Sequence, residues 1–79
     1  MRLRATLRRE AEWLIGFGAV PGDDTLSLVG DLTEAAANLF DALHRADLSG
    51  AAAIAVAPVP EQGIGIAIND RLRRAAHPR

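Results

Sequence analysis

The sequence predicts a small α/β domain with a mainly parallel sheet and the element order β-β-β-α-β-α. Short apolar runs bounded by glycine or proline are typical of buried strands, and two longer segments have the apolar spacing of helices. In the second half of the chain a strand, a helix and another strand follow one another, and such a unit places its strands parallel. We expect helices at residues 32–46 and 63–76 to cover the sheet.

Three strands are predicted in the first part of the chain. Met1–Thr6 alternates apolar and polar residues, as a half-buried edge strand does. Trp13–Phe17 is a short, bulky apolar run that ends at Gly18. A turn over Pro21–Asp24 separates it from a third strand over Leu26–Val29. Because Trp13–Phe17 is almost wholly apolar, we expect it to lie inside the sheet with both faces covered.

The first helix is predicted to begin after Asp31. The Asp31 carboxylate can accept an amide hydrogen bond near the helix start, and Glu34 can reach back to the amide of Asp31. The apolar positions of this helix form one stripe, which consists of Leu32, Ala36, Leu39, Phe40, Leu43 and Ala46. We therefore expect Leu39, Phe40 and Leu43 to be buried.

The last third of the chain predicts a strand and a helix. Ala51–Val56 is apolar, follows Gly50 and precedes Pro58, which favours a buried strand over a helix. The next helix carries a stripe of Ile64, Ile68, Leu72 and Ala75. His77 and Pro78 are expected to end that helix, because proline cannot continue the hydrogen-bond ladder.

Composition bounds the class of protein. A chain of 79 residues is a single domain, residues 1–79, with a thin core. It has no cysteine and no apolar run long enough for a membrane span, and its net charge of −1 argues against direct nucleic-acid binding. Eight of the nine basic residues, all arginine, lie near the two chain ends. They form either a basic patch or separate solvated side chains.

The sequence offers no catalytic constellation. A nucleophile needs a base within hydrogen-bond reach, but His77 lies in the tail of the chain and His44 falls on the flank of the first predicted helix, so no Ser-His-Asp triad is suggested. His44 with Asp41 or Asp47 supplies only two metal ligands, too few for a zinc site. We therefore predict no catalytic residue, no metal site and no cofactor in this chain.

Gly63 and Gly65 follow the last predicted strand and open the last predicted helix. Glycines at a helix start allow an anion, such as a nucleotide phosphate, to reach the helix amides. The dinucleotide fingerprint would place a further small residue at position 68, where Ile68 stands. Close packing of the helix against the sheet is the alternative explanation of the two glycines, and the sequence leaves both open.

Two segments resemble a known family. One is Gly30–Asp47, in which A-x-N-L-F-x-x-L leads to Asp47, and the other is Pro58–Ala76, which reads PVPEQGIGIAINDRLRRAA. Together they resemble the C-terminal accessory domain of the long, two-domain form of threonylcarbamoyl-AMP synthase, an enzyme related to the YrdC-like translation factors. Leu14–Gly18 is similar to the strand of that domain that ends in Phe-Gly. The tripeptide at residues 44–46 departs from the pattern.

The resemblance implies a Rossmann-like module that accompanies a catalytic domain. The full enzyme makes threonylcarbamoyl-AMP from threonine, bicarbonate and ATP for tRNA threonylcarbamoyladenosine, in the cytoplasm. The YrdC-like catalytic domain that performs this chemistry is absent from the chain and is the implied partner. Asn38, Asn69 and Arg71 lie within the motifs, where they either tether helices to loops or face the catalytic domain. A stand-alone interaction module, a homodimer and a small nucleotide-binding domain are the alternatives.

Overall fold

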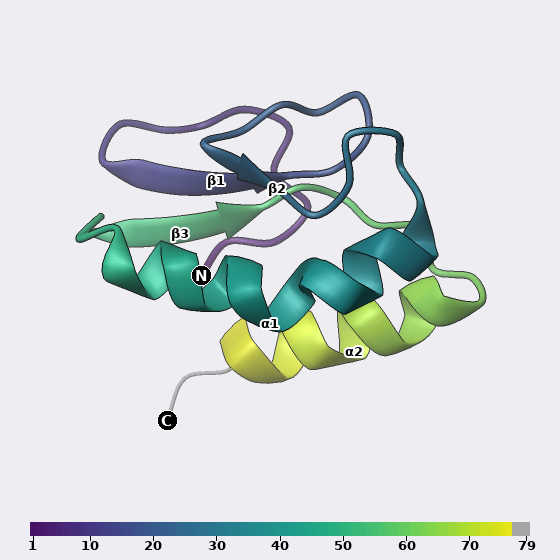
Figure 1. Cartoon of the computed structure of the whole chain (residues 1–79). Helices are drawn as coiled ribbons and strands as arrows, with labels where there is room; N and C mark the ends of the chain where they lie inside the picture. Colours follow the sequence, from purple (N-terminus) through teal and green to yellow (C-terminus); the bar gives the residue numbers. More distant parts are fainter. Residues whose placement is uncertain (77–79) are drawn as a thin grey trace.

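The computed structural model of the chain describes residues 1–76. Within these residues a parallel sheet has the strand order β2-β1-β3, and two helices pack on it. The elements in chain order are β1 (Glu12–Gly16), β2 (Asp24–Thr25), α1 (Leu32–Leu48), β3 (Ala53–Val56) and α2 (Ile64–Ala76). Figure 1 shows α1 and α2 side by side beneath one face of the sheet. The predicted α/β fold with a parallel sheet is confirmed.

Helix α1 begins as the sequence predicts, with one change in its cap. The Asp31 carboxylate accepts a hydrogen bond from the Thr33 amide, at 3.1 Å. The amide of Asp31 donates to the hydroxyl of Ser27 at 2.9 Å. The buried Ser27 side chain therefore makes the hydrogen bond that we predicted for Glu34. The hydroxyl links the helix start to the loop that follows β2.

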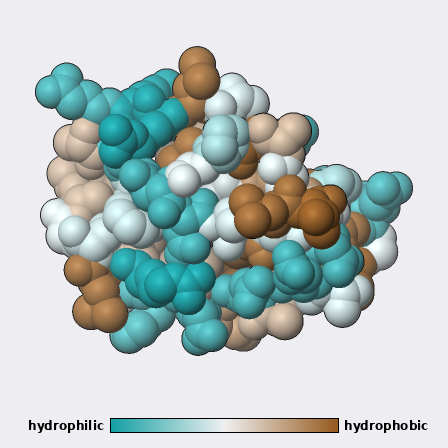
Figure 2. All heavy atoms as spheres, turned by 45° about the horizontal axis from the view of Figure 1, so that its top comes forward, coloured by the Kyte–Doolittle hydropathy of each residue, from teal (hydrophilic) through white to brown (hydrophobic). Residues whose placement is uncertain are grey.

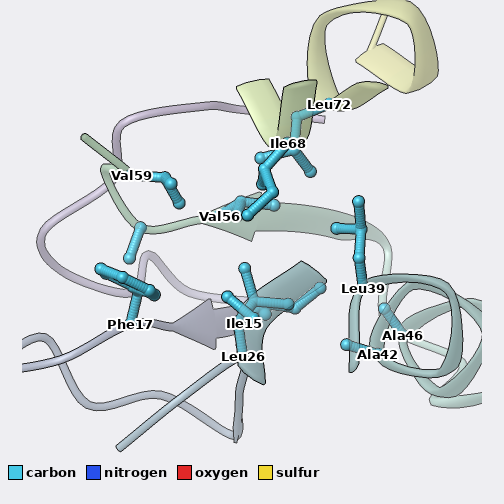
Figure 3. Close-up of a cluster of buried hydrophobic side chains, with 12 residues drawn as sticks. Ile15, Phe17, Leu26, Leu39, Ala42, Ala46, Val56, Val59, Ile68 and Leu72 are labelled. Carbon is cyan, nitrogen blue, oxygen red and sulfur yellow. The ribbon is translucent and has the colours of Figure 1, made fainter. Parts of the chain in front are cut away.

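The hydrophobic core lies between the helices and the sheet. Its side chains come from both layers, as Figure 3 shows, and include Ile15, Leu26, Leu39, Val56, Ile68 and Leu72. Leu39 is 4% exposed, which confirms the prediction that it is buried, and Leu72 on the apolar stripe predicted for the last helix is 2% exposed. Phe40 is 60% exposed, so the prediction that it is buried is wrong. It lies one position beyond Leu39, about 100° around the helix, which carries its ring away from the sheet.

The opposite face of the sheet carries no helix. Leu14 and Ala55 point to this face, and residues of the N-terminal segment cover them, with Ala5 only 1% exposed. The amides of Arg2 and Ala5 donate to carbonyls of β3. Met1–Thr6 therefore does lie at the sheet edge, although only one bridge, Arg2 with Ala55, has regular strand pairing.

Residues 17–23 cross over β1 on the same face before β2 begins. Two glycines permit the crossing. A side chain at Gly16 would lie 2.3 Å from the carbonyl oxygen of Val20, and one at Gly22 would lie 2.4 Å from that of Leu14. The crossing explains why β2 occupies Asp24–Thr25 and not the predicted Leu26–Val29, since the chain joins the sheet earlier. Leu28 and Val29 lie in the next loop and are exposed.

Figure 2 shows the molecule tilted so that the sheet side comes forward. Hydrophobic side chains on this face gather in separate small clusters among hydrophilic ones. No helix in the part of the chain that the structure describes is long and apolar enough to cross a membrane. The predicted end of α2 at His77 and Pro78 lies outside the described residues.

Candidate functional site

Asn38 and Asn69 occupy equivalent places in the two helices. The side-chain amide of Asn38 donates to the carbonyl of Leu26 at 3.0 Å, and that of Asn69 donates to the carbonyl of Val59 at 2.8 Å. Each acceptor lies in the loop that leads into the helix bearing the asparagine. Both asparagines therefore hold a loop after a strand against its helix, which is the tethering arrangement. Contact with a catalytic domain stays a prediction for these two residues.

The two glycines at the start of α2, Gly63 just before the helix and Gly65 as its second residue, have different structural roles. Gly65 is buried, and a side chain there would lie 1.9 Å from the carbonyl oxygen of Pro60. Its amide donates to the carbonyl of Gln62 at 2.9 Å. Gly63 has a φ of 55°, a conformation that glycine adopts without strain. Close packing and a left-handed turn account for both residues, and anion binding at this helix start stays a prediction.

Arg71 lies beside the exposed ring of Phe40. Its guanidinium carbon is 4.6 Å from the ring centroid, within the range of a cation–π contact. The two side chains border a shallow groove of about 210 Å³ between α1 and α2. The remaining lining residues are all apolar and consist of Ala36, Leu39, Ile64, Ala67 and Ile68. Arg71, the third residue predicted to contact a catalytic domain, therefore lies at the rim of an apolar groove. The spacing of residues in the sequence did not indicate this groove.

Glu12 anchors the N-terminal segment to the helix-free face. Its side chain is 6% exposed and accepts two hydrogen bonds from the Arg2 guanidinium, at 2.8 and 3.0 Å. The amide of Arg9 donates to the same carboxylate at 2.8 Å. The hydrogen bond from Arg2 and that from the Arg9 backbone lower the pKa of Glu12 to about 2, against burial, which raises it. This ion pair could not be predicted from the sequence, because Glu12 stands in a charged stretch with nothing to mark Arg2 as its partner.

Asp24 pairs with Arg45 across the other edge of the sheet. Burial raises the pKa of Asp24, but the hydrogen bonds from the Arg45 side chain and the Thr25 amide outweigh it, so the pKa is lowered. Within residues 1–76, five arginines form ion pairs with carboxylates, namely Arg2, Arg8, Arg45, Arg73 and Arg74. Four of the seven arginines that the structure describes near the chain ends are therefore paired with carboxylates, at separate places on the surface.

Within residues 1–76, no group of three or more histidine, cysteine or acidic side chains is placed to hold a metal ion. The fold and its surfaces define a small two-layer α/β domain with one apolar groove on its helical side.

Comparison with known proteins identifies the family. Residues 3–77 match the family described as the C-terminal domain of threonylcarbamoyl-AMP synthase, so the chain belongs to this family. It is 38% identical over 63 residues to the threonylcarbamoyl-AMP synthase of Pyrococcus abyssi (strain GE5 / Orsay). The match covers 80% of this chain and 18% of that relative. No solved structure matches the chain.

Proposed function

We propose that the chain is a non-catalytic accessory domain of an L-threonylcarbamoyladenylate synthase that acts in cytoplasmic tRNA threonylcarbamoyladenosine modification. Its partner is the YrdC-like catalytic domain of the enzyme. The observation that most supports this function is the family match over residues 3–77, together with a relative of which the chain spans only 18%. A domain that forms a small part of an enzyme has to act through its contact with the remainder.

The groove between α1 and α2 is the surface that we assign to this contact. Its lining is apolar, and the Phe40 ring at its edge is 60% exposed. Aromatic residues and arginine are enriched where protein interfaces derive most of their binding energy. Phe40 and Arg71 stand together at the groove, so a partner surface would cover the ring and retain the guanidinium at the rim.

Two measurements test the function. The purified 79-residue chain, given threonine, bicarbonate and ATP, should release no more pyrophosphate than a buffer control. Titration of the isotope-labelled chain with the catalytic polypeptide of the same organism should shift the amide signals of Ala36, Ile64 and Ala67. Pyrophosphate release by the chain alone would contradict the non-catalytic assignment.

Variants separate the groove from the remaining surface. Phe40→Ala and Arg71→Ala should each weaken binding by about 30-fold, because truncation of an interface hot spot costs about 2 kcal/mol or more. Arg74→Ala is the matched control, because Arg74 is exposed on the same helix, pairs with Asp70 and does not line the groove. Equal losses in all three variants would place the contact elsewhere. If the amide signals of the groove residues shift when the chain is concentrated without the catalytic polypeptide, a homodimer is favoured.

A further inference from the structure

The N-terminal segment leaves regular pairing with β3 after two residues. Arg2 pairs with Ala55, since the Arg2 amide donates to Ile54 and the Val56 amide donates to Arg2. In a regular parallel ladder the amide of Arg4 would donate next to the carbonyl of Val56. The amide of Ala5 does so, at 2.9 Å. One extra residue is therefore inserted in the edge strand, as in a β-bulge.

The bulge sends Arg4 to the helix side of the sheet. In a regular strand, positions 2 and 4 would share a face. Arg2 binds Glu12 on the helix-free face, and Ala5 packs on that face too, whereas Leu3 packs against the core below the helices. Arg4 has a left-handed φ of 56°, which is uncommon for arginine. Pro58 favours this break, because it has no amide to donate to the Arg4 carbonyl.

A pocket of about 170 Å³ lies where Arg4 meets α2. Leu3 and Val59 form its apolar part, and its polar lining consists of Arg4, Glu61, Asn69 and Arg73. Arg73 and Glu61 form an ion pair at 2.7 Å. The amide nitrogen of Asn69 is engaged by Val59, so its carbonyl oxygen is the group that can accept a further hydrogen bond.

We propose that this pocket binds a small α-amino acid in its zwitterionic form. The guanidinium groups of Arg4 and Arg73 match the carboxylate, which arginine recognises with paired hydrogen bonds. Glu61 and the free side-chain oxygen of Asn69 accept hydrogen bonds from the ammonium group. A small aliphatic side chain would lie on Leu3 and Val59.

The Glu61 carboxylate makes the pocket prefer a zwitterion over a simple anion. Glu61 stands among the lining residues and weakens the attraction of the two arginines for phosphate or a bare carboxylate, whereas an ammonium group on the ligand is attracted to Glu61. A simple amine, in turn, would meet two arginines. The pocket volume of about 170 Å³ suits a ligand of a few heavy atoms. This inference does not depend on the docking of a catalytic domain, because the pocket and the α1–α2 groove share no lining residue.

Titration of the isotope-labelled chain with L-alanine, followed by amide NMR, tests the proposal. The side-chain amide of Asn69 and the backbone amides of Leu3 and Glu61 should shift together and saturate with a dissociation constant of about 1 mM, as expected for a ligand of this size. Propionate and ethylamine, which each lack one of the two charges, should bind at least about tenfold more weakly. Absence of any shift with L-alanine overturns the proposal, as does equally tight binding of propionate.

Three variants localise the binding. Arg4→Gly removes the guanidinium while glycine accepts the left-handed backbone, so the chain should stay folded and lose affinity about tenfold. Glu61→Gln should remove the preference for L-alanine over propionate. Arg74→Gln is the control, since Arg74 is exposed on the same helix and does not line the pocket. Unchanged affinity in Arg4→Gly, or an equal loss in Arg74→Gln, contradicts the assignment.

Discussion

The two faces of the sheet are stabilised in different ways. On the helix side, large side chains such as Ile15, Val56 and Leu72 are buried between two layers of regular structure. On the other side, the covering chain is irregular, and its buried contacts are made by Ala5, Ala55 and Leu14. The Glu12–Arg2 ion pair adds to the stability of that side. Gly16 and Gly22 let residues 17–23 pass close to the backbone of β1.

The difference shows how a small domain can cover a sheet with few residues. The core beneath the helices combines large side chains, such as Leu39 and Leu72, with buried alanines of α1, and it delivers most of the hydrophobic stabilisation. An extended segment lies closer to the sheet and needs small side chains and hydrogen bonds. Mutations on the two faces should therefore fail for different reasons, through cavities on the helix side and through clashes or lost polar contacts on the other.

Leu72→Ala should have the largest effect. Leu72 is 2% exposed, and truncation of a buried leucine costs about 2–5 kcal/mol through lost burial and a residual cavity. Total stability for a domain of this size is about 3–5 kcal/mol, so the variant should be largely unfolded at room temperature. Urea unfolding followed by Trp13 fluorescence measures the change. Leu48→Ala is the control at a residue that is 73% exposed, and a parent-like midpoint for Leu72→Ala would refute the packing.

Gly16→Ala should be next, with a loss of about 1–3 kcal/mol as overpacking typically costs. The new methyl group would lie 2.3 Å from the Val20 carbonyl oxygen, which forces the crossing segment away from β1. Gly50→Ala is a useful comparison, because Gly50 has a positive φ but no atom within 4 Å of the added carbon. Its loss should be about 1 kcal/mol, from backbone strain alone. The same urea experiment ranks the two, and the reverse order would contradict the close approach.

Acid should weaken the helix-free face. The folded pKa of Glu12 is about 2 and its ordinary value is 4.5, so the ionised carboxylate stabilises the fold fully above pH 4.5. This contribution is lost as the pH falls from 4.5 towards 2. Glu12→Gln should flatten this part of the curve of unfolding free energy against pH. If the free energy of unfolding depends on pH in the same way in parent and variant, protonation of Glu12 does not contribute to the acid sensitivity of the fold.

Phe40→Ala should have the smallest effect on stability. Its ring is 60% exposed, so truncation should cost no more than about 1 kcal/mol, mainly from the contact with Arg71. Urea unfolding again measures the loss. A loss as large as that of Leu72→Ala would mean that the ring is part of the core. Because the stability effect is small, the variant can report on docking at the groove without unfolding the domain.

Much of the fold could be predicted because it depends on local patterns. The cap at Asp31, the stripes of α1 and α2 and the apolar run of β1 each carry their signal within one segment. The burial of Phe40 could not be predicted by the same means. Apolar residues spaced three to four apart identify one face of a helix, but they do not show which residues at the edge of that face are exposed to solvent. Leu39 and Phe40 are neighbours on that stripe, yet Leu39 is 4% exposed and Phe40 is 60% exposed.

The site features that escaped prediction depend on contacts between distant segments. Glu12 meets Arg2 because the N-terminal segment runs beside β3, and the pocket at Arg4 requires an insertion in the strand pairing. Neither has a signature in residue spacing. Asn38 and Asn69 were selected by resemblance, and the structure shows that both hold loops to helices, which is one of the two roles considered for them.

Amide hydrogen exchange at neutral pH in the parent and in Glu12→Gln tests most directly whether the two faces are stabilised separately. We expect the amide of Ala5, which joins the N-terminal segment to the carbonyl of Val56, to lose protection from exchange in the variant. The amides of Leu39 and Leu72 in the helices should keep their protection. Loss of protection by the same factor at all three amides would show that the two faces open as one unit, and it would contradict the account.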